Sequence, residues 1–353
     1  MRIMRTRTYV TALLAVSTVA ATVVALAAPS NAAPNDPLFG KQWGLTQINA
    51  PQAWASSTGA GVVIAVVDSG VDLHHPDLQG KLVPGATFVN CPAGQRPCGD
   101  GDWKGTDGIG DAADVHGTHV AGIAAAATNN GIGIAGTAPD AKIMPVKVLE
   151  TIGFYEDMAD GVRWATDHGA NVINMSFAGL PHEQLLALLG LETRLSDAIG
   201  YALNHGVAVI AAAGNTATPL CRDPAFTRDV ICVVATDRNQ LKTWYSELGL
   251  KPDLKVVAAP GGAALVNCDD DVWSLLPTGA GTCGQQDYGT LAGSSMSSPY
   301  VAGVAALLAA QGRNRASIYN AILSTARTPL LGRGVYTPLY GRGIVDAAAA
   351  VTS

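Results

Sequence analysis

The chain has 353 residues, of which 48% are hydrophobic and 14% are charged, and its formal net charge at pH 7 is -6. This composition supplies a large core and excludes an intrinsically disordered chain. The negative charge and the lack of a Lys/Arg run exclude the basic surface typical of nucleic-acid-binding proteins.

The first 32 residues have the pattern of a secretory signal peptide. Three arginines lie within the first seven residues, an apolar run follows from Val10 to Ala28, and Ser30–Ala32 has the small–x–small form of a cleavage site. A membrane anchor is the alternative, because the apolar run is borderline in length for a transmembrane helix. We expect residues 33–353 to form a secreted, extracellular protein that has no membrane association after cleavage.

In chain order, apolar runs alternate with helical patterns. The run 61–67 is continuous and rich in β-branched residues, which predicts a strand buried on both faces of a parallel sheet. Further strands are expected at 142–148, 171–175, 207–213, 231–235 and 256–259, and helices at 50–54, 116–127, 157–168, 183–205, 297–310, 316–324 and 345–351. This alternation predicts one α/β domain with a doubly wound, mostly parallel sheet flanked by helices.

Six cysteines agree with export to an oxidising compartment. Fifteen connectivities are formally possible, but pairing in sequence order would close three short loops. None of the spacings matches a zinc site. We expect disulfide bonds that fasten loops, formed by Cys91, Cys98, Cys221, Cys232, Cys268 and Cys283.

Residues 88–114 are expected to form a loop that is dense in Asp and Gly. Flexible oxygen ligands are what calcium prefers, so a calcium site over 100–111 is one hypothesis. A solvated acidic loop is the alternative.

Four polar residues stand where predicted strands end or predicted helices begin. Asp68 follows the first buried strand, His116 opens a helix, Asn215 follows the strand 207–213, and Ser295 precedes the helix 297–310. Functional residues of open α/β sheets gather at the carboxyl ends of strands. Taken alone, Ser295 fits an ordinary helix cap better than a catalytic residue, because serine is a preferred N-cap residue.

Together these four residues form a complete set for acyl transfer. Ser295 would attack a carbonyl, His116 would accept its proton, and Asp68 would orient the imidazole. The Asn215 amide and the Ser295 backbone N–H would donate to the oxyanion. His119 shares a helix face with His116, but a zinc site would bring a third nearby ligand, so we expect His119 to be structural.

The motifs that carry these residues resemble those of the subtilisin family of serine proteases, in particular its thermitase-like, secreted bacterial branch. They are Val66–Val71, His116–Gly122, Ala211–Asn215 and Gly293–Pro299. The order Asp, His, Ser along the chain is also that of subtilisin. The resemblance implies a secreted serine endopeptidase that acts on protein or peptide substrates, with catalytic residues Asp68, His116 and Ser295 and the oxyanion donor Asn215.

The same resemblance implies where an extended peptide would bind. Two short stretches would form the walls of the first specificity pocket, and their small apolar residues favour an apolar side chain before the cleaved bond within a broad specificity. The wall residues are Ser176, Phe177, Ala178, Gly179, Ala212, Ala213 and Gly214.

The resemblance further implies a structural calcium site and no organic cofactor. Its ligands would be the side chains of Asp36, Asp77 and Asn130 and main-chain carbonyls near Ala127, Ile132 and Ile134. We expect a monomer and recognise no pro-region between the signal peptide and the enzyme. Two alternatives are a catalytically weak or silent binding protein on the same scaffold and a non-peptidase acyl hydrolase, which would more naturally carry Gly-x-Ser-x-Gly.

Overall fold

The computed structural model describes residues 33–353, with the exception of 107, 109, 111–113, 151–152, 180–193 and 266. The predicted signal peptide lies outside the described residues, and so does the part of the expected helix 183–205 that precedes residue 194.

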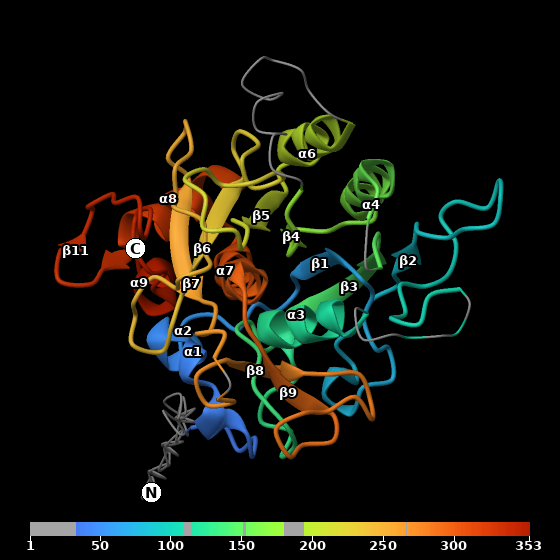
Figure 1. Ribbon diagram of the computed structural model, residues 1–353, viewed down its shortest axis with the longest axis horizontal. Helices are drawn as coiled ribbons and strands as arrows, with labels where there is room; N and C mark the ends of the chain where they lie inside the picture. Colours follow the sequence, from blue (N-terminus) through green and yellow to red (C-terminus); the bar gives the residue numbers. More distant parts are fainter. Residues whose placement is uncertain are drawn as a thin grey trace, which may run out of the picture. The chain divides into compact units, whose positions relative to one another are not determined.

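A seven-stranded sheet forms the centre of the described part of the chain (Figure 1). Its strand order is β2-β3-β1-β4-β5-β6-β7, and every pairing is parallel. The bounds are β1 Val63–Asp68, β2 Ala86–Thr87, β3 Lys142–Lys147, β4 Val172–Met175, β5 Ala208–Ala212, β6 Ile231–Thr236 and β7 Val256–Pro260. The chain winds from β1 toward both edges, which confirms the predicted doubly wound fold.

Helices cover both sides of this sheet. In Figure 1, α3 and α7 pack together on one side, and α4 and α6 lie next to each other on the other side. The bounds are α1 Trp43–Gln47, α2 Ala50–Ala53, α3 Val115–Ala125, α4 Tyr155–Asp167, α6 Arg194–Asn204, α7 Ser294–Ala309, α8 Arg315–Thr325 and α9 Ala347–Val351, with short 3₁₀ turns at Phe39–Lys41 and Pro76–Leu78.

Helix α7 is buried along nearly its whole length because it carries small and apolar residues on every face. It begins at Ser294, three residues before the expected start at 297. Gly293 occupies the N-cap position. Ser295 therefore lies inside the first turn of the helix, whereas the sequence placed it just outside.

Two short antiparallel ribbons were not predicted. One pairs β8 Val272–Leu275 with β9 Tyr288–Leu291, and the other pairs β10 Arg327–Thr328 with β11 Gly332–Arg333. Strand β8 packs against α3. Two-stranded ribbons of this length are marginal by themselves, so tertiary packing decides that they form.

The three expected disulfide bonds are confirmed as sequential pairs, Cys91–Cys98, Cys221–Cys232 and Cys268–Cys283. The second one joins the loop after β5 to β6. That loop is consequently fixed to the central sheet.

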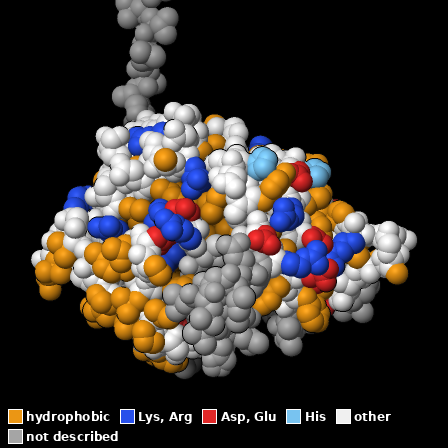
Figure 2. Space-filling view, turned by 90° about the horizontal axis from the view of Figure 1, so that it is seen from above, with side chains coloured by type: hydrophobic (Ala, Val, Ile, Leu, Met, Phe, Trp, Pro, Cys, Tyr) orange, Lys and Arg blue, Asp and Glu red, His pale blue; other side chains and the backbone are white. Residues whose placement is uncertain are grey.

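On the face shown in Figure 2, acidic and basic side chains are interspersed rather than gathered into one basic surface. No helix among the described residues is long and apolar enough to span a bilayer.

Candidate active site

Asp68 and His116 form a close pair at the carboxyl edge of the sheet. Asp68 ends β1 and is fully buried, and its Oδ1 lies 2.7 Å from Nδ1 of His116 in the first turn of α3. The same oxygen accepts the Ser69 backbone N–H at 2.8 Å. Because an ionised carboxylate only accepts, His116 Nδ1 carries the proton of this hydrogen bond, and Nε2 keeps a lone pair for a second partner.

Two opposing effects act on the pKa of His116. Burial lowers the pKa, but the charge of Asp68 and its hydrogen bond outweigh burial and raise the pKa above its ordinary value of 6.5. His119 behaves differently, because burial and then the neighbouring His116 lower its pKa to about 3. Its Nε2 lies 3.0 Å from the Val272 carbonyl oxygen, so His119 is a neutral side chain that packs α3 against β8.

Lys147, which the sequence analysis missed, connects the segments next to Asp68 and His116. It ends β3, is fully buried, and donates from Nζ to the Ser69 carbonyl at 2.8 Å, the Trp103 carbonyl at 3.0 Å and Asp114 Oδ1 at 3.0 Å. A single cation thus joins the turn after β1 to the residue that precedes α3. A lysine inside an otherwise apolar predicted strand was the available signal.

The backbone of Ser295 is held by a buried polar network. Pro299 lacks an N–H, so the Ser295 carbonyl has no helical partner four residues later. Ser176 Oγ donates to that carbonyl at 2.7 Å. The Asn174 amide donates to Ser176 Oγ at 2.9 Å and accepts from Ser298 Oγ at 2.6 Å. The end of β4 is therefore linked to the turn that carries Ser295. Two residues of this network, Asn174 and Ser298, were not singled out by the sequence analysis.

Asn215 and the start of α7 form a small space lined by donors. Asn215 Oδ1 accepts the Ser294 backbone N–H at 2.8 Å, which turns the amide NH₂ away from that bond. A carbon at the Cβ position of Gly293 would lie 3.2 Å from Asn215 Nδ2 and 3.7 Å from the Ser295 backbone nitrogen. Gly293 leaves this space open, and its φ of 152° also favours glycine. Two N–H groups that converge in this way can stabilise an oxyanion.

Comparison with known proteins identifies the family of the chain. The subtilase family model matches residues 59–343 of the chain. The chain belongs to the subtilase family. Thermitase from Thermoactinomyces vulgaris is 41% identical to this subtilase over 321 residues, which cover 90% of the chain and 99% of thermitase.

Two further relatives agree with this assignment. An extracellular protease from Xanthomonas campestris is 35% identical over 346 residues, covering 91% of the chain and 57% of that protein. A solved structure of a protease from Pseudoalteromonas arctica superposes with a TM-score of 0.76 at 35% identity, covering 91% of the chain and 99% of that structure. As a member of the family, the chain is a serine endopeptidase.

The two stretches expected to form the substrate walls of this subtilase leave the sheet side by side. Residues 176–179 continue β4, and Ala212–Gly214 ends β5, the adjacent parallel strand. Gly179 N–H donates to the Asp223 carbonyl at 2.7 Å, so the loop after β5 closes against the first wall.

The residues expected to bind calcium also come together. Asp36 accepts the backbone N–H groups of Asn129 and Asn130, at 3.0 and 3.2 Å. Asn130 Nδ2 donates to Asp77 Oδ1 at 2.7 Å, and the Ile134 N–H donates to Asp77 Oδ2 at 3.0 Å. The N-terminal arm, the 3₁₀ turn after β1 and the loop after α3 therefore meet at this place.

Two carboxylates in this cluster are buried. Asp36 is 3% exposed and Asp77 is 0% exposed. The pKa of Asp77 is raised to about 6, and burial is the largest cause of this rise. Hydrogen bonds from Ile134 and Asn130 oppose the rise, and the charge of Asp36 adds to it. Neither carboxylate forms an ion pair with a Lys or Arg side chain within the described ranges.

The main-chain ligands expected near Ala127 and Ile132 lie in the same cluster. The Ala127 N–H donates to the Asp77 carbonyl at 2.9 Å, and the Ile132 N–H donates to Asn130 Oδ1 at 3.1 Å. The second calcium hypothesis, in the 100–111 loop, stays a prediction, because residues 107 and 111 lie outside the described residues. Asp114 of that loop pairs with Lys147.

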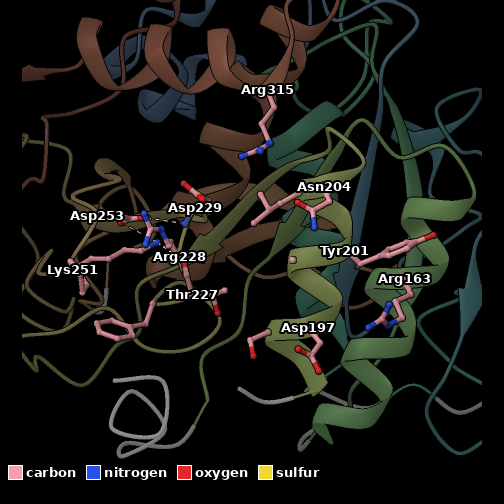
Figure 3. Close-up of a pocket in the computed structure, with 15 residues that line it drawn as sticks. Arg163, Asp197, Tyr201, Asn204, Thr227, Arg228, Asp229, Lys251, Asp253 and Arg315 are labelled. Carbon is pink, nitrogen blue, oxygen red and sulfur yellow. Dashed lines mark hydrogen bonds and ion pairs between the residues drawn. The ribbon is translucent and has the colours of Figure 1, made fainter. Parts of the chain in front are cut away.

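A cavity of about 880 Å³ lies away from these residues (Figure 3). Helices α4 and α6 form one side of it and two loops form the other, with Arg163 and Tyr201 facing Arg228 and Lys251 across the opening. None of the residues expected in the active site lines this cavity. The cavity therefore lies apart from the expected active site.

Proposed function

We propose that this subtilase cleaves peptide bonds through Asp68, His116 and Ser295, with Asn215 and the Ser295 N–H as oxyanion donors. The observation that carries the proposal is the 2.7 Å hydrogen bond between Asp68 Oδ1 and His116 Nδ1. It supplies the imidazole tautomer that a base needs, on an element that packs against the helix of Ser295.

The chemistry follows from the atoms in place. Ser295 Oγ attacks the substrate carbonyl carbon, and its proton passes to His116 Nε2. Asp68 stabilises the imidazolium, which then protonates the leaving amine as the C–N bond breaks. Water repeats the sequence on the acyl-enzyme and releases the acid. The negative carbonyl oxygen is held by the two N–H donors that converge beside Gly293.

The substrate would lie extended between the walls 176–179 and 212–214, held mainly by main-chain hydrogen bonds. Taken alone, the small apolar walls favour an apolar side chain before the cleaved bond. Relatives described as extracellular support secretion, and we propose cleavage of the signal peptide after Ala32 and a monomeric enzyme. N-terminal sequencing and light scattering of the secreted protein test these two points.

Covalent labelling tests the proposed chemistry. A fluorophosphonate probe should modify Ser295, and a peptide library incubated with the enzyme should yield defined cuts by mass spectrometry. A folded, calcium-loaded protein that takes up no probe and cuts no peptide would instead be a silent binding protein on this scaffold.

Replacing Asn215 by Leu should lower kcat by about 10²–10³-fold and change KM little, which is the effect known for the oxyanion asparagine of subtilisin. Leu keeps the side-chain volume but loses the donor. The control is Asn239→Leu on the exposed turn after β6, which should leave both constants unchanged. A rise of KM by the same factor with an unchanged kcat would instead assign Asn215 to ground-state binding.

We also propose that calcium is held by Asp36, Asp77 and Asn130 with nearby main-chain carbonyls. The two buried carboxylates form no ion pair with a Lys or Arg side chain within the described ranges, and they fit a divalent ion. The ion would neutralise their repulsion and join three distant segments. Its role there is structural.

Removing calcium with a chelator should therefore lower Tm. An ion that binds only the folded state at 100 times its Kd adds about 2.7 kcal/mol, which is roughly 4 °C in a chain of this size. Calorimetry measures the shift, which should vanish in Asp77→Asn and persist in the surface control Asp269→Asn. An unchanged Tm together with no calcium binding by titration calorimetry would remove the site.

A further inference from the structure

Arg222 lies between the two walls of the expected specificity pocket. Its guanidinium donates to the Gly179 carbonyl of one wall, and NH1 donates to Thr216 Oγ1, just beyond the other wall, at 3.3 Å. Its backbone N–H donates to the Ala213 carbonyl at 2.9 Å. A carbon at the Cβ position of Gly214 would lie 2.7 Å from Arg222 Cδ. The side chain therefore crosses the space between the walls and forms its floor.

This cation is buried, and it has no carboxylate partner among the described residues. Arg222 is 7% exposed, and its Nε is buried with no hydrogen-bond partner. Arg222 forms no ion pair with any carboxylate in the part of the chain that is described. Of its five N–H donors, two are used by Gly179 and Thr216.

Two acidic residues near Arg222, Glu247 and Asp223, do not pair with its guanidinium in the described part of the chain, and Asp223 Oδ1 is buried without a hydrogen-bond partner. Glu247 is fully buried, and its carboxylate accepts from Thr216 Oγ1 at 2.6 Å, from the Thr216 N–H at 3.2 Å and from the Thr218 N–H at 2.7 Å. Asp223 is also buried, which raises its pKa, while the charge of Lys251 lowers it. Neither carboxylate lies within 4.0 Å of the guanidinium nitrogens, so three of the Arg222 donors, the buried Nε–H among them, have no hydrogen-bond partner among the described residues.

We propose that Arg222 makes the first specificity pocket select an acidic side chain before the cleaved bond. This inference rests on the proposed function, because it assigns the preference of the same active site. A planar guanidinium binds a carboxylate through two parallel hydrogen bonds, and a buried, unpaired cation gains most from such a partner. A large apolar side chain would meet the charge and leave its donors unsatisfied.

The floor is also rigid, which favours selection over adaptation. Cys221, the residue before Arg222, is bonded to Cys232 in β6. The Arg222 backbone is bonded to β5, and the next residue accepts the Gly179 N–H. The guanidinium is consequently presented from a segment anchored on both sides, and ordering it costs little when substrate binds.

Peptide p-nitroanilides that differ only in the residue before the cleaved bond test the proposal. With Glu, Gln, Leu and Phe at that position, kcat/KM should be about 10- to 100-fold higher for Glu than for its neutral isostere Gln. In Arg222→Gln the Glu/Gln ratio should fall to about 1 or below and the Leu/Gln ratio should rise. The control Arg228→Ala, which removes an exposed cation from the same segment, should leave both ratios unchanged.

Fluorophosphonate labelling separates this inference from the proposed function. Loss of the Glu preference in an Arg222→Gln protein that still labels at the wild-type rate supports the inference. A labelled wild-type enzyme with a Glu/Gln ratio of 1 or less overturns it and leaves the proposed function standing. If Arg222→Gln does not fold, the Glu/Gln ratio of the wild-type enzyme is measured at a series of pH values across the titration of the substrate carboxyl. A Glu preference that does not fall as this carboxyl is protonated contradicts the ion pair with Arg222.

Discussion

Ser295→Ala should lower kcat by about 10⁶-fold, the loss known for the nucleophilic serine of subtilisin. In the proposed mechanism, the Ser295 hydroxyl oxygen forms the bond to the substrate. KM should change little, since the walls and the oxyanion donors remain. Steady-state hydrolysis of a chromogenic peptide measures the loss, and fluorophosphonate labelling should disappear with it.

Ser297→Ala is the matched control. Ser297 lies two residues further along α7, is buried, and donates from Oγ to the Ala259 carbonyl at 3.0 Å. Losing that bond should cost about 1–3 kcal/mol of stability and leave kcat within a few-fold of wild type. A comparable collapse of activity in Ser297→Ala, with wild-type activity in Ser295→Ala, would mean that the nucleophile has been misassigned.

Asp68→Asn should lower kcat by about 10⁴-fold and move the acidic limb of the pH–rate profile to lower pH. In the wild type, kcat/KM should rise as His116 loses its proton, at a pH above 6.5 because Asp68 raises the pKa of the imidazole. Without that charge, burial remains and lowers the pKa of His116 below 6.5. The variant should therefore reach its own lower plateau at a more acidic pH.

The pH dependence distinguishes this role from a purely structural one. Asp269→Asn removes a surface carboxylate and should move neither the plateau nor the limb. A slower Asp68→Asn enzyme whose acidic limb stays in place would show that another group sets the pKa that controls the rate.

The sequence predicted the sheet well because its strands are short apolar runs buried on both faces. The six strands expected from 61–67 to 256–259 begin and end within two residues of the observed bounds. The polar residues at their ends were recognisable for a related reason, because each stands where an apolar pattern stops. The start of α7 was placed late, since the two serines after Gly293 and the Ser-Ser-Pro sequence after Met296 read as a turn.

Other features depend on contacts between segments that are far apart in the sequence. Lys147 and Asp114 are separated by 33 positions, and Ser298 and Asn174 by 124. The position of Arg222 could not be predicted from the neighbouring sequence, because it depends on two walls that come from different strands. The expectation of an apolar pocket used the walls alone and took no account of what lies between them.

The hydrogen bond from Ser176 to the Ser295 carbonyl joins one wall of the proposed substrate cleft to the turn that carries the proposed nucleophile. In the proposed mechanism, redesigning that wall to accept new peptides would displace the atom that attacks them. Selectivity and turnover in this enzyme should consequently be difficult to vary one at a time from the β4 side, and the opposite wall is the better starting point for changing what it cleaves.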